Sequence, residues 1–61
     1  MKVKELRQKR NLTLRALSEL SGVHYSLLSL IENEKAPVTA KTAQKIAKAF
    51  GLKKWWVFVE E

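Results

Sequence analysis

Residues 25–33 hold the side chains of this chain that are best suited to contacting a ligand. They read YSLLSLIEN, and a helix that turns by about 100° per residue places Leu28 and Ile31 on one side. The other side carries hydroxyl, phenol and amide groups, which donate and accept hydrogen bonds, together with one leucine. Its members are Tyr25, Ser26, Ser29, Leu30 and Asn33. We therefore expect a helix with one buried face and one face that can bind a partner.

The residues before that helix have the features needed to hold it in place. They read as a first short helix, whose Leu17 and Leu20 join Val23 on a core shared with the second helix. Gly22 ends the first helix, where a left-handed residue costs least, and Ser18 is small enough for the two helices to cross closely. Two short helices joined by such a tight turn are typical of a helix-turn-helix, whose second helix enters the DNA major groove.

The charge balance favours a polyanionic partner. The 61 residues contain 12 Lys or Arg against 6 acidic residues, which gives a net charge of +6. Such a surplus on a small domain favours nucleic acid before a membrane surface. Without cysteine, neither a disulfide nor a thiolate metal site is available, and we expect a cytoplasmic protein. The basic start lacks the apolar run of a signal peptide, and no stretch is long enough for a membrane span.

The whole chain is expected to form one all-α domain over residues 1–61. Helices are predicted at about 2–10, 14–21, 25–33 and 40–50. Thr13 and Thr39 are suitable N-terminal caps, and Asn11 can take the left-handed turn after the first helix. Residues 53–59 are expected to form either a last helix or a short strand.

Several short motifs, in their order along the chain, resemble those of a known family. The matching pieces are Leu6-Arg7, Leu12-Thr13, Ser21-Gly22-Val23, Ile31-Glu32-Asn33 and Lys45-Ile46-Ala47-Lys48-Ala49-Phe50-Gly51. Over about residues 2–58, they are similar to the phage-repressor type of helix-turn-helix, the lambda-repressor/Cro (Xre) family. The resemblance implies a five-helix DNA-binding domain, which binds a two-fold operator as a homodimer.

The resemblance also implies which residues touch double-stranded DNA. The family uses the N-terminal cap of its recognition helix and the next residue against phosphates or base edges, and these positions are His24 and Tyr25 here. His24 could instead serve only as a helix cap. Arg15, near the start of the helix before, is expected to contact phosphate. Lys35 and Lys41, which follow the recognition helix, are expected to do the same.

Other positions carry a structural role or depart from the family pattern. The family pairs the positions of Arg7 and Glu32 as a buried salt bridge, so we assign these two residues to the scaffold. Breaking such a pair costs roughly 3–5 kcal/mol. Leu14 stands where the family usually has Gln. Glu34 replaces a common Gly and adds a negative charge near the expected phosphates.

The exposed face of the recognition helix leaves alternatives open. Ser26 and Ser29 can each make one hydrogen bond, to a base or to a phosphate. Leu30 could meet a thymine methyl group or mark a surface that binds protein. Asn33 could touch the DNA backbone or only cap the helix. Between Tyr25 and Leu30 there is no Arg, Lys, Gln or Asn, whose bidentate contacts would each give roughly 1–3 kcal/mol of discrimination.

The apolar run WWVFV near the carboxyl end exceeds what so small a core can bury. A helix that is apolar all round leaves one side uncovered, and a strand places Trp55, Val57 and Val59 on one face. Such patches usually mark an interface. Because the family dimerises through its last element, we expect residues 53–59 to form the dimer contact through these three residues, with Trp56 in the core. Alternatively, the whole segment packs onto its own domain.

The composition argues against an enzyme. One histidine and no Asp or Cys leave neither a nucleophile–base pair nor a metal constellation, and we expect no cofactor. The sequence therefore predicts a phage-type repressor that binds operator DNA as a homodimer. The alternative is the same fold used as a protein-binding module, of the antitoxin or anti-repressor type, through Tyr25, Leu27 and Leu30.

Overall fold

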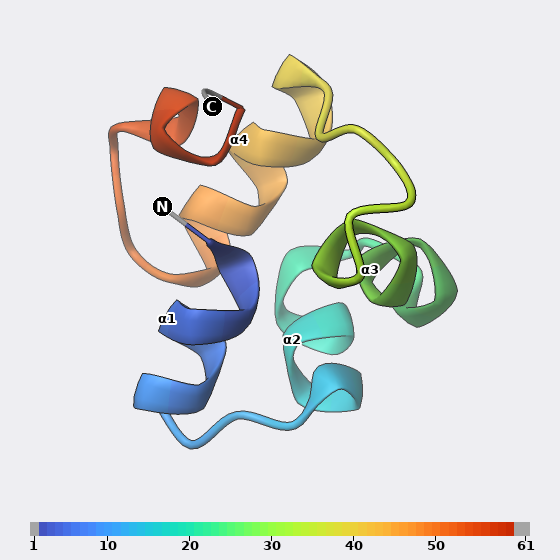
Figure 1. The fold of residues 1–61 in the computed structure, drawn as a ribbon. Helices are drawn as coiled ribbons and strands as arrows, with labels where there is room; N and C mark the ends of the chain where they lie inside the picture. Colours follow the sequence, from blue (N-terminus) through green and yellow to red (C-terminus); the bar gives the residue numbers. More distant parts are fainter. Residues whose placement is uncertain (1, 60–61) are drawn as a thin grey trace.

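The computed structural model describes residues 2–59, and the regular elements of this part are all helices. In chain order they are α1 (Val3–Lys9), α2 (Leu14–Ser21), α3 (Tyr25–Glu32), α4 (Ala40–Ala49) and η1 (Trp55–Phe58) (Figure 1). The all-α expectation is confirmed for these residues. The fifth element, η1, is a short 3-10 helix instead of the α-helix or strand expected there. Residues 1, 60 and 61 of the expected domain lie outside the described residues.

Three of the helices begin at a side chain that accepts a hydrogen bond from the first turn. Thr13 Oγ1 accepts from the backbone N–H of Ala16 at 3.0 Å, at the start of α2. Thr39 Oγ1 accepts from the backbone N–H of Thr42 at 3.2 Å, at the start of α4. The third such cap is His24, at the start of α3. These caps satisfy N–H groups that have no partner within the helix, so the boundaries follow from local sequence.

The carboxyl ends of α1, α3 and α4 share one geometry. The left-handed residues that follow these helices are Asn11 (φ 56°), Glu34 (φ 59°) and Gly51 (φ 72°). In each case the N–H of the next residue donates to the carbonyl five residues earlier, at 2.8 to 3.1 Å, which is the Schellman motif. Glycine and asparagine adopt this conformation readily, but glutamate does not. The end of α3 is therefore the strained one of the three.

One core holds the helices together. Its buried members are Val3, Leu17, Val23, Leu28, Ile31, Ala43, Ile46, Ala47, Phe50 and Phe58. Leu20 was expected to join them but is 60% exposed. Leu17 is the buried residue of α2, and Leu14, Ala16, Ser18 and Ser21 are half-buried. Leu20 lies about 100° around the helix from the centre of these residues, at the edge of the inward side, and its side chain remains exposed.

Two arginines tie α1 to the rest of the domain. Arg7 Nε and Nη2 donate to the two carboxylate oxygens of Glu32 at 2.8 and 3.1 Å, and Nη1 donates to the carbonyl of Leu12 at 2.8 Å. The two paired side chains are only 14% and 7% exposed. The hydrogen bond to Glu32 raises the pKa of Arg7 above its ordinary value. The pair implied by the resemblance is thus present. Arg10 Nη1, which was not anticipated, donates to the carbonyl of Phe50 at 3.0 Å.

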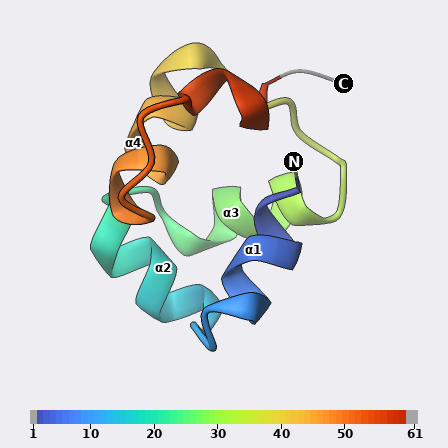
Figure 2. The same ribbon diagram turned by 90° about the vertical axis from the view of Figure 1, so that its left-hand side faces the viewer.

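The 3-10 geometry of η1 decides which of its aromatic rings are buried. η1 packs beside α4 in both views (Figure 2), and the Phe58 ring lies 6.1 Å from the Phe50 ring between centroids. Because a 3-10 helix has three residues per turn, residues i and i+3 share a face. Phe58 is buried and Trp55 half-buried on one face, whereas Trp56 (50% exposed) and Val59 (39%) share the other. The expectation that Trp56 would be the core aromatic is therefore wrong.

Candidate nucleic-acid interface

The turn between α2 and α3 sets the direction in which α3 leaves the core. Gly22 adopts φ 77°, and its N–H donates to the carbonyl of Ser18 at 2.9 Å. The Ser18 hydroxyl donates across the turn to the carbonyl of Val23 at 2.7 Å, and Val23 is buried. Glycine is favoured here, because residues with a side chain are strained at this φ. The turn places α3 along one edge of the molecule, on the right in Figure 1.

Four of the expected contact residues meet at the amino ends of α2 and α3. Arg15 Cζ lies 5.9 Å from the centroid of the Tyr25 ring, within the range of a cation–π contact. The Tyr25 ring stacks on the His24 ring, with centroids 5.1 Å apart. Ser26 Oγ lies 2.6 Å from His24 Nδ1. All four side chains are exposed. We call these residues, Arg15, His24, Tyr25 and Ser26, the amino-end cluster.

The hydrogen bonds of His24 define the state of its ring. Nδ1 accepts from the backbone N–H of Ser26 at 3.1 Å and lies within hydrogen-bond distance of the Ser26 hydroxyl. A ring nitrogen that accepts a hydrogen bond carries no hydrogen, so the neutral ring has its hydrogen on Nε2. His24 therefore caps α3 with one nitrogen and keeps the other as a donor. The two roles weighed for this residue are compatible.

The middle and end of α3 are less polar than the sequence pattern indicated. Asn33 Nδ2 donates to the carbonyl of Ser29 at 2.8 Å, so Asn33 caps the end of the helix. Ser29 is half-buried. Leu30 is 45% exposed, and Leu27, one turn before it, is 36% exposed. The exposed surface of this part of the helix is thus largely that of two leucines.

Charged residues flank α3 on the side of the following loop. Lys35 in this loop and Lys41 in the first turn of α4 are exposed, and neither belongs to the amino-end cluster. Glu34 pairs with Lys2, whose Nζ lies 2.9 Å from Glu34 Oε2. The hydrogen bond from Lys2 and its positive charge lower the pKa of Glu34. Lys2 thus offsets the negative charge that Glu34 brings to this side of the domain.

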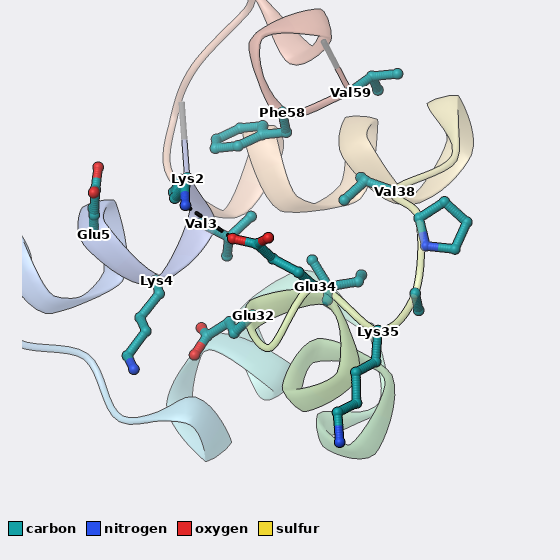
Figure 3. A pocket seen from close by; sticks show the side chains of 13 residues that line it. Lys2, Val3, Lys4, Glu5, Glu32, Glu34, Lys35, Val38, Phe58 and Val59 are labelled. Carbon is teal, nitrogen blue, oxygen red and sulfur yellow. Dashed lines mark hydrogen bonds and ion pairs between the residues drawn. The ribbon is translucent and has the colours of Figure 1, made fainter. Parts of the chain in front are cut away.

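A groove of about 820 Å³ lies between α1, the loop after α3 and η1. Val3, Glu34 and Phe58 line it from these three directions (Figure 3). Its lining contains three lysines and three glutamates, which include the paired Glu32 and Glu34. Because these charges are balanced, the groove does not favour a polyanion. We therefore locate the candidate nucleic-acid interface at α3 and outside this groove.

Two contacts of this surface were not expected from the sequence, namely the Arg15–Tyr25 contact and the Lys2–Glu34 pair. A cation in the first turn of α2 and an aromatic residue at the start of α3 were the signal for the first contact, but the distance between them depends on the helix crossing.

Within residues 2–59, no group of three or more metal-ligating side chains could hold a metal ion. No helix in the same range has both the length and the apolar character to cross a membrane.

Comparisons with known proteins agree with this geometry. A family model described as Helix-turn-helix matches residues 3–54. The chain is 39% identical over 51 residues to the HTH-type transcriptional regulator PuuR of Escherichia coli (strain K12), and equally to PuuR of Shigella flexneri. The match covers 84% of this chain and 28% of each relative, so the chain spans less than a third of their length. No solved structure matches significantly. The chain belongs to the helix-turn-helix family of the lambda-repressor (Xre) type, a family of DNA-binding transcriptional regulators.

Proposed function

We propose that this domain binds operator DNA, with α3 in the major groove, and thereby regulates transcription. The observation that carries the proposal is the exposed amino-end cluster on a chain of net charge +6. Recognition helices of this motif present their amino-terminal residues to base edges. The N–H groups and dipole at a helix amino end also attract phosphate. The relatives named as transcriptional regulators support the same role.

The contact residues divide between phosphates and bases. Arg15, Lys35, Lys41 and the Nε2–H of His24 are donors suited to phosphate oxygens, and such contacts orient the protein without reading sequence. The residues that face the bases are Tyr25, Ser26, Ser29 and Leu30. Asn33 has a second amide hydrogen beyond the one that caps α3, and this hydrogen can reach a phosphate.

We also propose that two copies bind a two-fold operator. Half-sites one helical turn apart are separated by roughly 34 Å. The domain is 24 Å across in its longest direction, so one copy suits one half-site. Trp56 and Val59 supply exposed apolar surface for the contact between copies. Trp55 and Val57, which the sequence analysis placed beside Val59 at the interface, are half-buried against the core, so we assign the leading role to Trp56.

The salt dependence of DNA affinity tests the proposal. The affinity for a duplex selected from a random pool is measured by fluorescence anisotropy as salt increases. If about six phosphates are neutralised, affinity falls about a thousandfold between 50 and 200 mM salt. Arg15→Ala should weaken binding to all sequences alike. Lys53→Ala, which removes the same charge from the segment between α4 and η1, away from α3 in Figure 1, is the matched control and should have a smaller effect. An absence of DNA binding at low salt would contradict the proposal.

A protein-binding role is the second candidate. Exposed Tyr25, Leu27 and Leu30 on one helix would suit an apolar protein surface, as in an antitoxin or anti-repressor. Such binding gains little from Arg15 and responds weakly to salt. The same titration therefore separates the two candidates.

A further inference from the structure

The polar groups of the α3 surface are largely occupied by bonds within the chain. Ser26 Oγ lies 2.6 Å from His24 Nδ1, and the Asn33 amide donates to the carbonyl of Ser29 at 2.8 Å. Ser29 itself is half-buried. The Ser26 hydroxyl can donate to a base only if its contact with His24 breaks, and the Ser29 hydroxyl belongs to a half-buried residue. Apart from the exposed Tyr25 hydroxyl, α3 therefore offers few donors to a base edge.

The groups that remain exposed in the middle of α3 are apolar. Leu30 is 45% exposed and Leu27 is 36% exposed. Residues three apart on a helix are neighbours on its surface, so the two side chains form one patch. Along the chain, the patch lies between the amino end of α3, where Arg15 and the His24 Nε2–H are suited to phosphates, and the loop that holds Lys35. A helix held on DNA at these two places would bring Leu30 against the bases, with Leu27 beside it.

The major groove offers one apolar group to such a patch. Its base edges display donors and acceptors, together with the 5-methyl group of thymine. A leucine packed on that methyl group removes apolar surface from water, whereas a leucine over the donor of cytosine or the acceptors of guanine leaves those groups without a partner. The patch therefore both favours thymine and disfavours a G·C pair.

We propose that Leu30, with Leu27 beside it, reads thymine methyl groups, so that the sites preferred by this domain carry thymine opposite the middle of α3. The inference rests on the proposed function, in which α3 enters the major groove. The net charge of +6 and the cation Arg15, which lies on α2 against the Tyr25 ring of α3, favour DNA over an apolar protein as the occupant of this surface.

Replacing thymine with deoxyuridine tests the inference, because this removes the methyl group and leaves every hydrogen-bonding group in place. Each thymine of a selected duplex is replaced in turn, and the affinity is measured by fluorescence anisotropy. We expect a loss of about threefold for each methyl group that the patch covers. Leu30→Ala should remove this difference between thymine and deoxyuridine, and so should Leu30→Gln. Circular dichroism verifies that both variants are folded, as expected for a side chain that is 45% exposed.

Leu20→Ala is the matched control, since it removes an exposed leucine (60%) that lies on α2. This variant should keep the wild-type ratio between thymine and deoxyuridine. Equal affinity of the wild type for both duplexes, with the expected salt dependence, would overturn this inference and leave the proposed function standing. An absence of salt-dependent DNA binding would overturn both and would favour the protein-binding role.

Discussion

At the scale of single residues, Glu34 stands out as a glutamate in a left-handed position, with φ 59°. It completes the Schellman motif at the end of α3, where glycine would be unstrained. Relieving a strain of about 1 kcal/mol shifts the melting temperature of a domain this small by about 4–8 °C. We therefore predict that Glu34→Gly raises the melting temperature by an amount in this range, measured by circular dichroism.

Two variants separate backbone strain from charge in that experiment. Glu34→Ala removes the carboxylate and keeps a side chain at a left-handed position, so it should not reproduce the gain. Lys35→Gly introduces a glycine at the next residue, which does not have a positive φ, and it should lower the melting temperature. A gain in Glu34→Ala equal to that of Glu34→Gly would assign the effect to charge and contradict the strain argument.

The Arg7–Glu32 and Lys2–Glu34 ion pairs should differ in their importance for stability. The Arg7–Glu32 pair is almost fully removed from water, whereas the side chains of Lys2 and Glu34 are 67% and 72% exposed. Hydrogen bonds to buried charged groups contribute more than exposed ion pairs, so Glu32→Gln should lower the free energy of unfolding by about 2–3 kcal/mol. Glu34→Gln should leave it nearly unchanged. Urea denaturation compares the two, and equal effects would contradict the burial argument.

The Lys2–Glu34 pair also predicts a pH dependence. Lys2 lowers the pKa of Glu34 in the folded protein, so the pair contributes stability above the ordinary pKa that Glu34 has in the unfolded chain and loses it as pH falls through the lower, folded pKa. Lys2→Ala should therefore raise the pKa of Glu34 toward its ordinary value. Titration of the Glu34 side-chain carboxyl carbon by NMR measures this shift. An unchanged pKa would show that the pair does not persist in solution.

At the scale of elements, boundaries set by local chemistry could be predicted from the sequence. Thr13 and Thr39 begin α2 and α4 as expected, because their hydroxyl groups accept hydrogen bonds from the first turn. Gly22 ends α2 as expected, because glycine adopts φ 77° without strain. The exposure of Leu20 could not be derived from local apolar spacing, since it depends on where the other helices pack against α2. The run WWVFV has no polar residue to mark a period, so neither its 3-10 form nor its buried face could be predicted.

At the candidate site, too, the contacts that depend on packing between helices could not be predicted from the sequence. A helical wheel placed Tyr25, Ser26, Leu30 and Asn33 on the outer face of α3, where they are exposed, but it also placed the half-buried Ser29 there and left out the exposed Leu27. The hydrogen bonds that occupy Ser26 and Asn33, and the approach of Arg15 to Tyr25, depend on side-chain rotamers and on the crossing of two helices. The polar character of the face was therefore overestimated, and the exposed surface of its leucines was underestimated.

The 3-10 form of η1 predicts that its two tryptophans contribute differently to stability. Trp55 shares the inward face with Phe58, whereas Trp56 points outward and is 50% exposed. Trp55→Ala should lower the free energy of unfolding by about 2 kcal/mol, because apolar surface returns to water, whereas Trp56→Ala should change it by less than about 0.5 kcal/mol. Urea denaturation at low protein concentration, where copies are separate, measures both. The reverse order would indicate that the two tryptophans exchange faces in solution.

At the scale of the whole molecule, charge and apolar surface lie in different regions. The amino-end cluster lies at the amino ends of α2 and α3, whereas Trp56 and Val59 project from η1, which packs on α4. These two regions lie on different sides of the ribbon in Figure 1. Two copies that meet through η1 can therefore each keep α3 uncovered, as binding to two half-sites requires.

Because the two regions are separate, Trp56→Glu should disrupt the contact between copies without altering α3. A charge on the outward face of η1 should leave the domain folded and keep two copies apart, because a buried unpaired carboxylate is costly. Sedimentation equilibrium should then give a monomer where the wild type forms a dimer. The affinity for a single half-site should be unchanged, whereas the affinity for a two-fold operator should fall to that of one half-site, since the second copy no longer adds to the binding. Val59→Glu, on the same face, should act alike. A wild type that sediments as a monomer at high micromolar concentration and binds the two half-sites independently would show that η1 is not the dimer contact.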